Sequence, residues 1–423
     1  MRGTGNWVAN QRPENWREMI LYLYPNGKVP LTAMLAMLKS EATNDPKYHW
    51  WTKTLPKQLA DVTGVYTDTA LTVAYAGSGT TGTVLYVKMS AAQASEFRDG
   101  HTVILTKKGN HEYDTFGSVE VRVINGANSY IGVRLEEDDD TPTDLSDADF
   151  VFIVGNANPE GAEIPDSIAY DPVQYTNVTQ IFRTPLSLTR TAMKTKLRTG
   201  DAYQEAKREA LELHAIEMEK AFLFSKMTER VVSGKPRRTT QGMIPFIEQY
   251  APTENIDSFT SNVTYSGDTW LQEGETWMDE RLEQIFRYGN SEKMAFCGTG
   301  ALRGINRLAK QTGEISLRVM DAAYGLKVVE WVTPTGTVFL KTHPLFSYNP
   351  QYNNSIVMFD LDKLGYRFID DTFFKADKSD RENTNNSRDG KEEEFLTECG
   401  FEADHPETMG ILHGVGLDNE LTP

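Results

Sequence analysis

The sequence is poor in the residues that most often form cross-links or cross a membrane. Only two of its 423 residues are cysteine, Cys297 and Cys399, which excludes a framework of several disulfides. No apolar run approaches the roughly 20 residues that a membrane-spanning helix needs, so no membrane span is predicted. Its first residues include no apolar stretch typical of a signal peptide, and we expect a cytoplasmic protein whose cysteines are free thiols.

Positive charge is also scarce. The chain has 43 Lys and Arg residues against 60 Asp and Glu residues, which makes its net charge −17. Affinity for nucleic acid depends on Lys and Arg side chains that neutralise phosphates, so this balance argues against a dedicated nucleic-acid-binding protein. An acidic surface suits a protein that stays soluble at high concentration, or one that lines a DNA-filled space without adhering to the DNA.

Motifs for catalysis and cofactor binding are missing as well. Neither GxSxG nor HExxH occurs, and the seven histidines have no metal-ligand spacing. The glycine-rich segment 77–82 lacks the lysine of a phosphate-binding loop, and segment 298–304 lacks the glycine spacing of a dinucleotide fingerprint. The sequence therefore predicts no catalytic residues, no cofactor and no metal.

Two charged clusters leave alternatives open. We interpret the acidic run 136–140 as a solvated loop tip, with calcium binding as an alternative, although the run lacks the alternating ligands of a calcium loop. Paired carboxylates for glycoside hydrolysis are a weaker alternative, because a contiguous acidic run makes a poor pocket. We interpret the basic run 235–238 as an exposed loop at a helix end, with contact to DNA or an acidic neighbour as the alternative.

Length and patterning predict several domains of mixed α and β structure. A chain of 423 residues exceeds the size, roughly 250–300 residues, at which a single core stops growing. Short β-type runs separated by turn residues fill 62–155, with a hairpin signal at Asn125-Gly126, and predict a small antiparallel barrel or sandwich. Helix and strand patterns then alternate over 237–369, with helices at 276–288 and 300–310 and strands at 327–332, 337–340 and 355–359.

A single long helix is predicted from Asp201 to about Thr228, with its end signal at 233–236. Its apolar residues form two neighbouring stripes, Leu211, Ala215, Met218 and Phe222 beside Ala206, Ala210 and Leu213. We expect this face to be buried. The charged face, with Glu205, Arg208, Glu212 and Glu219, is expected to be solvated or to contact a neighbouring subunit.

The two ends of the chain are predicted to be arms. Near the N-terminus, Leu31, Met34, Leu35 and Leu38 predict one short amphipathic helix, and 48–56 is predicted to be extended. Trp50 and Trp51 point to opposite sides of a strand, so we expect one to pack inward and the other to meet a neighbouring subunit; burial of both within one chain is the alternative. From residue 370 the composition is polar and typical of disorder, and we expect neighbouring chains to hold this segment.

Five features occur in a fixed order along the chain. They are Tyr24-Pro25-Asn26-Gly27-Lys28-Val29-Pro30-Leu31-Thr32, His49-Trp50-Trp51, Tyr175-Thr176-Asn177-Val178-Thr179-Gln180-Ile181-Phe182, the long helix, and Leu361-Asp362-Lys363-Leu364-Gly365-Tyr366-Arg367. In their order and spacing they resemble the major capsid proteins of tailed bacteriophages with the Hong Kong 97-like fold, in a branch with a β-rich insertion.

The resemblance implies an α+β shell subunit with an inserted small antiparallel β-barrel or sandwich. It assigns 1–47 to an N-terminal arm, 48–61 and 156–198 to the limbs of an extended loop, 62–155 to an inserted β-domain, 199–249 to a peripheral domain with a spine helix, 250–335 to an axial domain, 336–369 to return strands of the peripheral domain, and 370–423 to a C-terminal tail.

The implied function is self-assembly, in the host cytoplasm, into an icosahedral head shell of hexamers and pentamers around double-stranded DNA. Weak non-specific contact with that DNA is implied, and portal, scaffold or decoration proteins are further implied partners. The candidate interface residues are Trp50, Trp51, Gln180, Phe182, Arg183, Glu205, Arg208 and Glu212. Two alternatives stay open: a β-rich extracellular carbohydrate-binding or glycoside-hydrolysing protein, and a bacterial nanocompartment shell protein.

Overall fold

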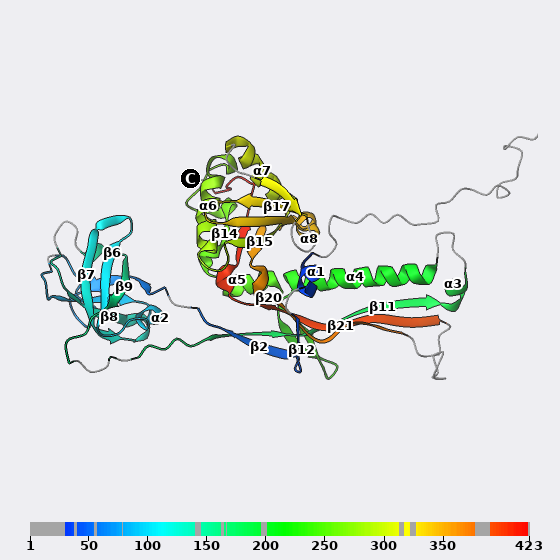
Figure 1. Ribbon diagram of the computed structural model, residues 1–423, viewed down its shortest axis with the longest axis horizontal. Helices are drawn as coiled ribbons and strands as arrows, with labels where there is room; N and C mark the ends of the chain where they lie inside the picture. Colours follow the sequence, from blue (N-terminus) through cyan, green and yellow to red (C-terminus); the bar gives the residue numbers. More distant parts are fainter. Residues whose placement is uncertain are drawn as a thin grey trace, which may run out of the picture. The chain divides into compact units, whose positions relative to one another are not determined.

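A computed structural model divides the chain into two compact units (Figure 1). Unit 1 comprises Met1–Trp50 and Gln174–Pro423, and unit 2 comprises Trp51–Val173. The structure describes residues 30–37, 40–54, 57–77, 79–139, 145–161, 165, 167–195, 201–312, 317–321, 327–376 and 390–421. Within these ranges no helix is both long enough and apolar enough to cross a membrane.

Unit 2 is built on one antiparallel sheet of seven strands in the order β3-β9-β6-β7-β8-β5-β4. The strands are β3 (Leu59–Asp61), β4 (Gly64–Tyr66), β5 (Val84–Met89), β6 (His101–Lys107), β7 (Asn110–Val123), β8 (Ser129–Leu135) and β9 (Phe150–Asn156). One short helix, α2 (Ala91–Ala94), precedes β6. The hairpin predicted at Asn125-Gly126 is confirmed, because β7 and β8 pair on either side of it.

The sheet of unit 2 curls until its two edges approach each other. Its edge strands, β3 and β4, are separated in sequence only by Val62 and Thr63. The amide of Val62 donates to the Asp149 carbonyl just before β9, and the amide of Thr63 donates to the Lys88 carbonyl in β5. The linker therefore bridges both edges, and the inward-facing side chains form a core of their own.

Unit 1 has a mixed sheet of seven strands in the order β14-β22-β19-β15-β18-β17-β16. These are β14 (Ile256–Ser258), β22 (Gly410–His413), β19 (Ile356–Phe359), β15 (Glu292–Cys297), β18 (Thr337–Thr342), β17 (Lys327–Val332) and β16 (Leu317–Asp321). The helices that belong to this part of unit 1 are α5 (Met243–Tyr250), α6 (Trp270–Phe286), α7 (Thr299–Thr312) and α8 (Pro344–Tyr348). The predicted helices at 276–288 and 300–310 correspond to α6 and α7, although α6 begins six residues earlier than predicted. At this start the Thr269 amide donates to Gln272 Oε1 (3.0 Å) in a local capping box, and the Trp270 amide donates to the Asp418 carboxylate (2.8 Å).

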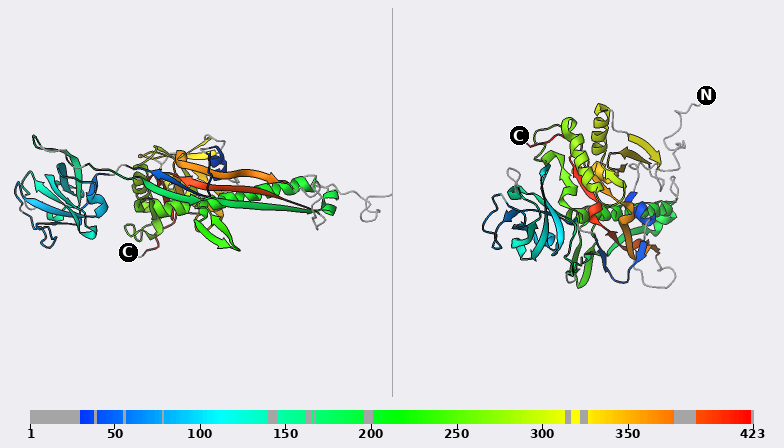
Figure 2. Two further views of the ribbon diagram at one scale, coloured as in Figure 1. Left: turned by 90° about the horizontal axis from the view of Figure 1, so that it is seen from below. Right: turned by 60° about the vertical axis from the view of Figure 1, so that its left-hand side comes forward.

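A second sheet of unit 1 carries the long helix. Its order is β1-β20-β21-β11, with β1 (Ser40–Ala42), β20 (Leu364–Lys375), β21 (Gly390–Ala403) and β11 (Gln180–Thr189), and the short helix α3 (Arg190–Lys194) follows β11. Helix α4 (Ala202–Phe224) lies along β11 and β21 (Figures 1 and 2). The Asp201 side chain caps its first turn by accepting from the Tyr203 amide at 2.9 Å.

The buried face of α4 differs from the predicted stripes. Ala210, His214, Met218 and Phe222, spaced by four residues, face the core, whereas Leu211 is 44% exposed and Leu213 is 52% exposed. Glu219, expected on the charged face, is also buried, because its carboxylate accepts hydrogen bonds from the Leu31 amide and from His343 Nε2. The helix also ends at Phe224, earlier than predicted. Residues 228–239 instead form the hairpin of β12 (Thr228–Val232) and β13 (Lys235–Thr239), with Ser233 at φ 50° and Gly234 at φ 76° in its turn. The predicted helix end is therefore a two-residue hairpin turn, which requires positive φ at both positions.

The segment after residue 370 is part of the core sheets. β21 lies between β20 and β11, and β22 lies between β14 and β19. The expectation that neighbouring chains hold this segment is therefore wrong for β21 and β22, because strands of the same chain flank both. Alternating buried side chains, Phe395, Thr397 and Cys399 among them, place one face of β21 against the core.

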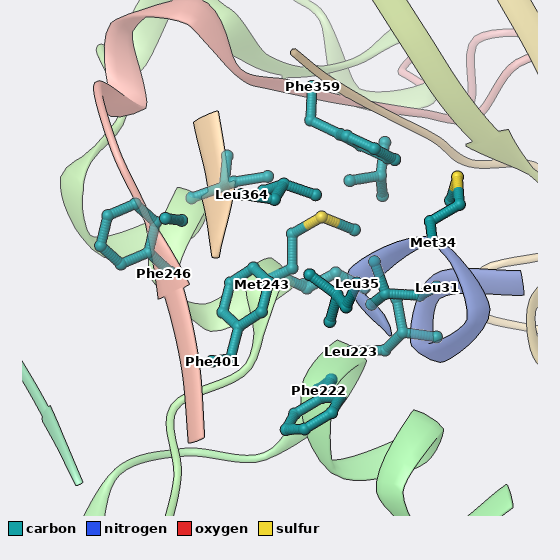
Figure 3. Close-up of a cluster of buried hydrophobic side chains, with 14 of the residues drawn as sticks. Leu31, Met34, Leu35, Phe222, Leu223, Met243, Phe246, Phe359, Leu364 and Phe401 are labelled. Carbon is teal, nitrogen blue, oxygen red and sulfur yellow. The ribbon is translucent and has the colours of Figure 1, made fainter. Parts of the chain in front are cut away.

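The N-terminal helix is confirmed as α1 (Pro30–Met37), whose Leu31, Met34 and Leu35 are buried in the main core of unit 1 (Figure 3). Leu38, the fourth residue of the predicted apolar face, lies outside the described residues. The chain then forms β2 (Lys47–Thr52), which pairs with β10 (Val173–Val178) in a two-stranded sheet. The part of 48–56 that lies in β2 is thus extended, as predicted.

Candidate subunit interface

The described residues hold no group of acidic, histidine or cysteine side chains arranged to bind a metal. Both thiols are buried, and burial raises the pKa of Cys297 and that of Cys399 to about 12. A thiol with so high a pKa is a poor nucleophile. The glycine at position 298 has a packing role, since a Cβ there would collide with the Asn353 carbonyl.

The acidic run of unit 2 is used within the unit itself. Four of its carboxylates accept hydrogen bonds from different residues: Glu136 from the Ser118 hydroxyl, Glu137 from the Phe116 amide, Asp138 from the Thr81 amide and hydroxyl, and Asp139 from the Tyr75 hydroxyl and the Leu145 amide. These carboxylates tie loops and strands together and do not converge on one point. Asp140 lies outside the described residues.

The four-stranded sheet of unit 1 has one face on α4 and one face away from it, called here the outer face. On β11 the residues alternate, with Phe182, Thr184 and Leu186 buried and Ile181 and Arg183 exposed. Register places the outer-face residues of the neighbouring strands beside these: Glu394, Leu396 and Glu398 on β21, and Phe373 and Lys375 on β20. The outer face therefore combines apolar side chains with charges.

Arg183 lies at the centre of the charges on the outer face. Its Nε and Nη2 donate to the two carboxylate oxygens of Glu394, each at 2.8 Å, and Lys375 Nζ donates to the same carboxylate at 3.1 Å. Burial alone would raise the pKa of Glu394, but the two cations outweigh it and lower that pKa. Because the Arg183 side chain is 58% exposed, this pair adds little to the stability of the single chain.

The other two candidates on β11 serve the chain itself. Phe182 is buried and its ring packs edge-on against His214 and Phe222 of α4. Gln180 is partly exposed, and its Oε1 accepts from the Thr240 amide at 3.1 Å. Phe182 is thus a core residue, because strand alternation turns it toward the helix.

The two tryptophans lie on opposite faces of β2, as predicted. Trp50 is buried, its Nε1 donates to the Ala403 carbonyl at 3.1 Å, and its ring lies beside Tyr48, Tyr175 and Phe246. Trp51 is 60% exposed. Of the pair, only Trp51 presents its indole on the surface of the chain.

Helix α4 presents the remaining candidates. Arg208 is exposed, and Glu205 and Glu212 are partly exposed, on the side of the helix away from its buried face. Leu211 and Leu213 lie beside them and were expected to be buried. Their outward position adds an apolar component to the charged surface of α4.

Two surface features were missed by sequence reasoning. The first is the β12–β13 hairpin, whose signal was the Ser233-Gly234 turn between β-branched residues. The second is a groove beside α6, lined by acidic residues of that helix and by the loop 333–335. Its components come from segments that are distant in sequence, so no local pattern indicates it.

Comparison with known proteins places the chain in a family. The family model described as SU10 major capsid protein matches residues 2–416. The major capsid protein of Pseudomonas phage PaMx41 is 26% identical over 351 residues, which cover 82% of this chain and 77% of that protein.

Two solved structures show weak likeness. A structure from Mycobacterium phage Bobi covers 96% of this chain and 96% of that one, with 8% identity and a TM-score of 0.46. An encapsulin complex of Synechococcus elongatus covers 58% of this chain and 76% of that one, with 10% identity and a TM-score of 0.39. Both scores are too low to support an argument. The family model, by contrast, spans nearly the whole sequence, and this chain belongs to the SU10 major capsid protein family.

Proposed function

We infer that the chain is the major capsid protein of a tailed phage and forms the shell of its head. The observation that carries this conclusion is the family match over residues 2–416, together with the relative in Pseudomonas phage PaMx41. The protein is a structural component of the virion and not an enzyme, and its copies assemble with one another into the shell.

The finer proposal is that the subunit has the Hong Kong 97-like arrangement with an insertion. In this proposal α4 is the spine helix, and β2 and β10 begin and end an extended loop in which a β-domain is inserted at 62–155. Support comes from unit 2, which has its own sheet and its own core. That sheet also includes β3, just before residue 62. The remaining parts are an arm at 1–47, loop limbs at 48–61 and 156–198, a peripheral domain at 199–249 and 336–369, an axial domain at 250–335, and the C-terminal segment 370–423.

The subunit contacts are proposed to use the exposed candidates. Arg183 on the outer face, Trp51 on β2, and Glu205, Arg208 and Glu212 on α4 each present a side chain that is at least partly exposed. Gln180, partly exposed at the start of β11, is proposed as a further contact, whereas burial of Trp50 and Phe182 removes them from the proposal. A contact between different patches, repeated around five-fold and six-fold axes, would close a container of pentamers and hexamers.

Further partners are proposed from the role of the shell. These are the enclosed double-stranded DNA, contacted weakly, and portal, scaffold or decoration proteins. A net charge of −17 supports weak contact with DNA, because the chain as a whole repels phosphate.

The experiment is negative-stain electron microscopy of the purified full chain after size exclusion. Closed shells, tubes or rings in the large fraction would support self-assembly, whereas a monomer that stays single even with the phage's other head proteins would contradict it. A matched pair of variants tests the outer face: Arg183→Glu should reduce particles, while Arg190→Glu, also a cationic residue of the same segment, should not.

The inserted domain is tested by deletion of 62–155. If this segment is an insertion, far-ultraviolet circular dichroism of the shortened chain should retain the helical signal of unit 1, and particles should be altered or weakened. Loss of the helical signal would contradict the proposed insertion.

A further inference from the structure

Among the described residues, the β12–β13 hairpin of unit 1 is a two-stranded sheet with no third strand, and all five residues of β12 are exposed. An isolated two-stranded hairpin is only marginally stable in water, so stable hairpins of this kind gain from additional packing. Val231 is 72% exposed, which shows that the rest of the chain covers little of this hairpin.

The two faces of this hairpin differ sharply in charge. Register places Arg230 directly opposite Arg237 and Val232 opposite Lys235, so these four side chains share one face, the cationic face. The other face carries Val231 and Pro236, and its Arg238 is neutralised by Glu229 at 2.9 Å. The three cations of the cationic face have no acidic partner among the described residues.

Like charges placed directly opposite each other destabilise a strand pair. The Arg230 and Arg237 pair therefore opposes formation of the hairpin unless an anionic group lies against it. Arginine is well suited to binding such an anionic group, because its planar guanidinium binds carboxylates with two parallel hydrogen bonds. The cationic face thus has the chemistry of a site for carboxylates or phosphates.

A matching surface lies elsewhere on unit 1. Two adjoining hollows beside α6, of about 440 and 530 Å³, share Glu275, Asp279 and Pro334 in their linings. Glu275, Asp279 and Glu283 follow one another at intervals of four residues, so they form one acidic row along the helix. We call this surface the acidic groove.

The floor of the acidic groove is apolar. Met278, Ile305, Leu308 and Trp331 line it, and Val332 at its rim is about half exposed. Asp279 makes no hydrogen bond or ion pair with any other described residue, and burial raises the pKa of its carboxyl. Asp279 therefore places a negative charge, without a partner among the described residues, beside the apolar floor, whereas Glu283 of the same row forms an ion pair with Arg287 at 3.6 Å.

We propose that the cationic face of the hairpin docks into the acidic groove of a second copy of this chain, with Val232 toward the apolar floor and the arginines toward the acidic row. The proposal rests on the inferred assembly of copies into a shell. The two patches differ, so the contact is heterologous and can propagate around a ring.

Charge and apolar surface together favour protein over nucleic acid as the occupant. Phosphates would satisfy the arginines but would leave Val232 without an apolar partner. The acidic groove offers both kinds of partner, and a shell presents copies of it at high local concentration. Nucleic acid is therefore the competing outcome that the test must separate.

Disulfide trapping tests the contact directly, because both native cysteines are buried and give little background. The full chain would carry Val232→Cys on the hairpin and Thr276→Cys at the acidic groove. Mild oxidation followed by non-reducing electrophoresis should show a ladder of interchain species. The matched control replaces Val232→Cys by Val231→Cys, which is more exposed but lies on the other face, and should show no ladder.

Charge reversal completes the test. Adding Arg230→Glu and Arg237→Glu should abolish the ladder, and further adding Asp279→Lys and Glu283→Lys should restore it. Nuclease treatment should leave the ladder unchanged. Absence of a ladder, an equal ladder from the Val231→Cys control, survival of the ladder after charge reversal, failure of the second pair to restore it, or its loss with nuclease would each overturn the proposal.

The electron microscopy of the unaltered chain is scored separately. Particles without a ladder would refute the docking and leave the shell function intact. A ladder without particles would support the docking and count against self-sufficient shell assembly.

Discussion

Replacement of Glu219 should weaken unit 1 more than replacement of any exposed glutamate on α4. Glu219 is buried, and its carboxylate accepts hydrogen bonds from four donors. They are the Leu31 amide (2.8 Å), the Thr32 amide (2.6 Å), the Thr32 hydroxyl (2.5 Å) and His343 Nε2 (2.8 Å). The two amides open α1 and have no carbonyl partner in that helix, so Glu219 caps α1 from another helix.

The histidine is arranged as a donor in this network. His343 Nδ1 accepts from the Leu345 amide at 3.1 Å, which places the ring proton on Nε2, facing Glu219. All four donors therefore require an acceptor at position 219.

Glu219→Gln keeps the shape of the side chain and isolates the loss of an acceptor. One amide oxygen can still accept from two donors, but the NH₂ group faces the Thr32 amide, which is then left unsatisfied in a buried site. An unsatisfied buried donor costs about 1–3 kcal/mol, and loss of the charge weakens the remaining bonds by about 1 kcal/mol. We therefore expect a loss of about 2–4 kcal/mol in the free energy of unfolding.

Urea unfolding followed by tryptophan fluorescence measures this loss. Trp270, Trp277 and Trp331 are buried in unit 1, so the signal reports chiefly on that unit. The control is Glu209→Gln, an exposed glutamate on the same helix, for which we expect a change within about 0.5 kcal/mol. Amide hydrogen exchange at Leu31 and Thr32 should also become faster in the Glu219 variant.

Two results would refute this reasoning. One is an unfolding midpoint for Glu219→Gln equal to that of Glu209→Gln. The other is unchanged exchange at Leu31 and Thr32, which would show that the carboxylate does not hold α1.

Three further predictions concern unit 1. Lys293→Met should lower the free energy of unfolding, measured in urea, by about 3–5 kcal/mol, because the buried Asp360 carboxylate, 2.8 Å from Lys293 Nζ in the native chain, loses its cation. Adding Asp360→Leu should recover most of the loss, and no recovery would contradict the pairing. The stability of unit 1 should fall as the pH drops below 6.5, because burial lowers the pKa of His214 and that of His413 below this ordinary value and the unfolded chain therefore takes up protons first. The urea midpoint should be lower at pH 5.5 than at pH 7.5, and the difference should be smaller in His214→Gln. A midpoint that does not change with pH would contradict this prediction. Arg183→Ala should change the stability of the dissociated chain by less than about 1 kcal/mol and yet reduce particles counted by electron microscopy, and an unchanged count would remove Arg183 from the interface.

Local patterns were sufficient to predict elements whose burial repeats with a regular period. The amphipathic helix at α1, the strands of unit 2 and the opposite orientation of Trp50 and Trp51 all follow from such periods, and the structure confirms them. The Asp201 cap likewise marks the start of α4. In each case the cause lies within a few residues of the effect.

The predictions that the structure contradicts concern residues whose contacts are with partners distant in sequence. β21 has three glutamates in its first half, a composition typical of an exposed segment, yet Glu393 is buried and accepts from the Tyr203 hydroxyl at 2.6 Å. On α4, Leu211 and Leu213 are exposed, and His214, which belongs to neither predicted stripe, is buried instead because it forms hydrogen bonds with Thr184 of β11 and Thr397 of β21. Such pairings are set by which strands meet the helix, which no local period reveals.

The buried polar groups of unit 1 also separate folding from assembly. Glu219, Lys293 and His214 form their hydrogen bonds within the chain, so substitutions there should reduce the stability of the fold before they affect assembly. The three cations of the cationic face, and Asp279 in the acidic groove, have no oppositely charged partner among the described residues, so changes there should spare the fold and act on contacts between copies. A protein that must first fold as a single chain and then join many copies benefits from this separation, because its assembly surfaces can change without loss of the core.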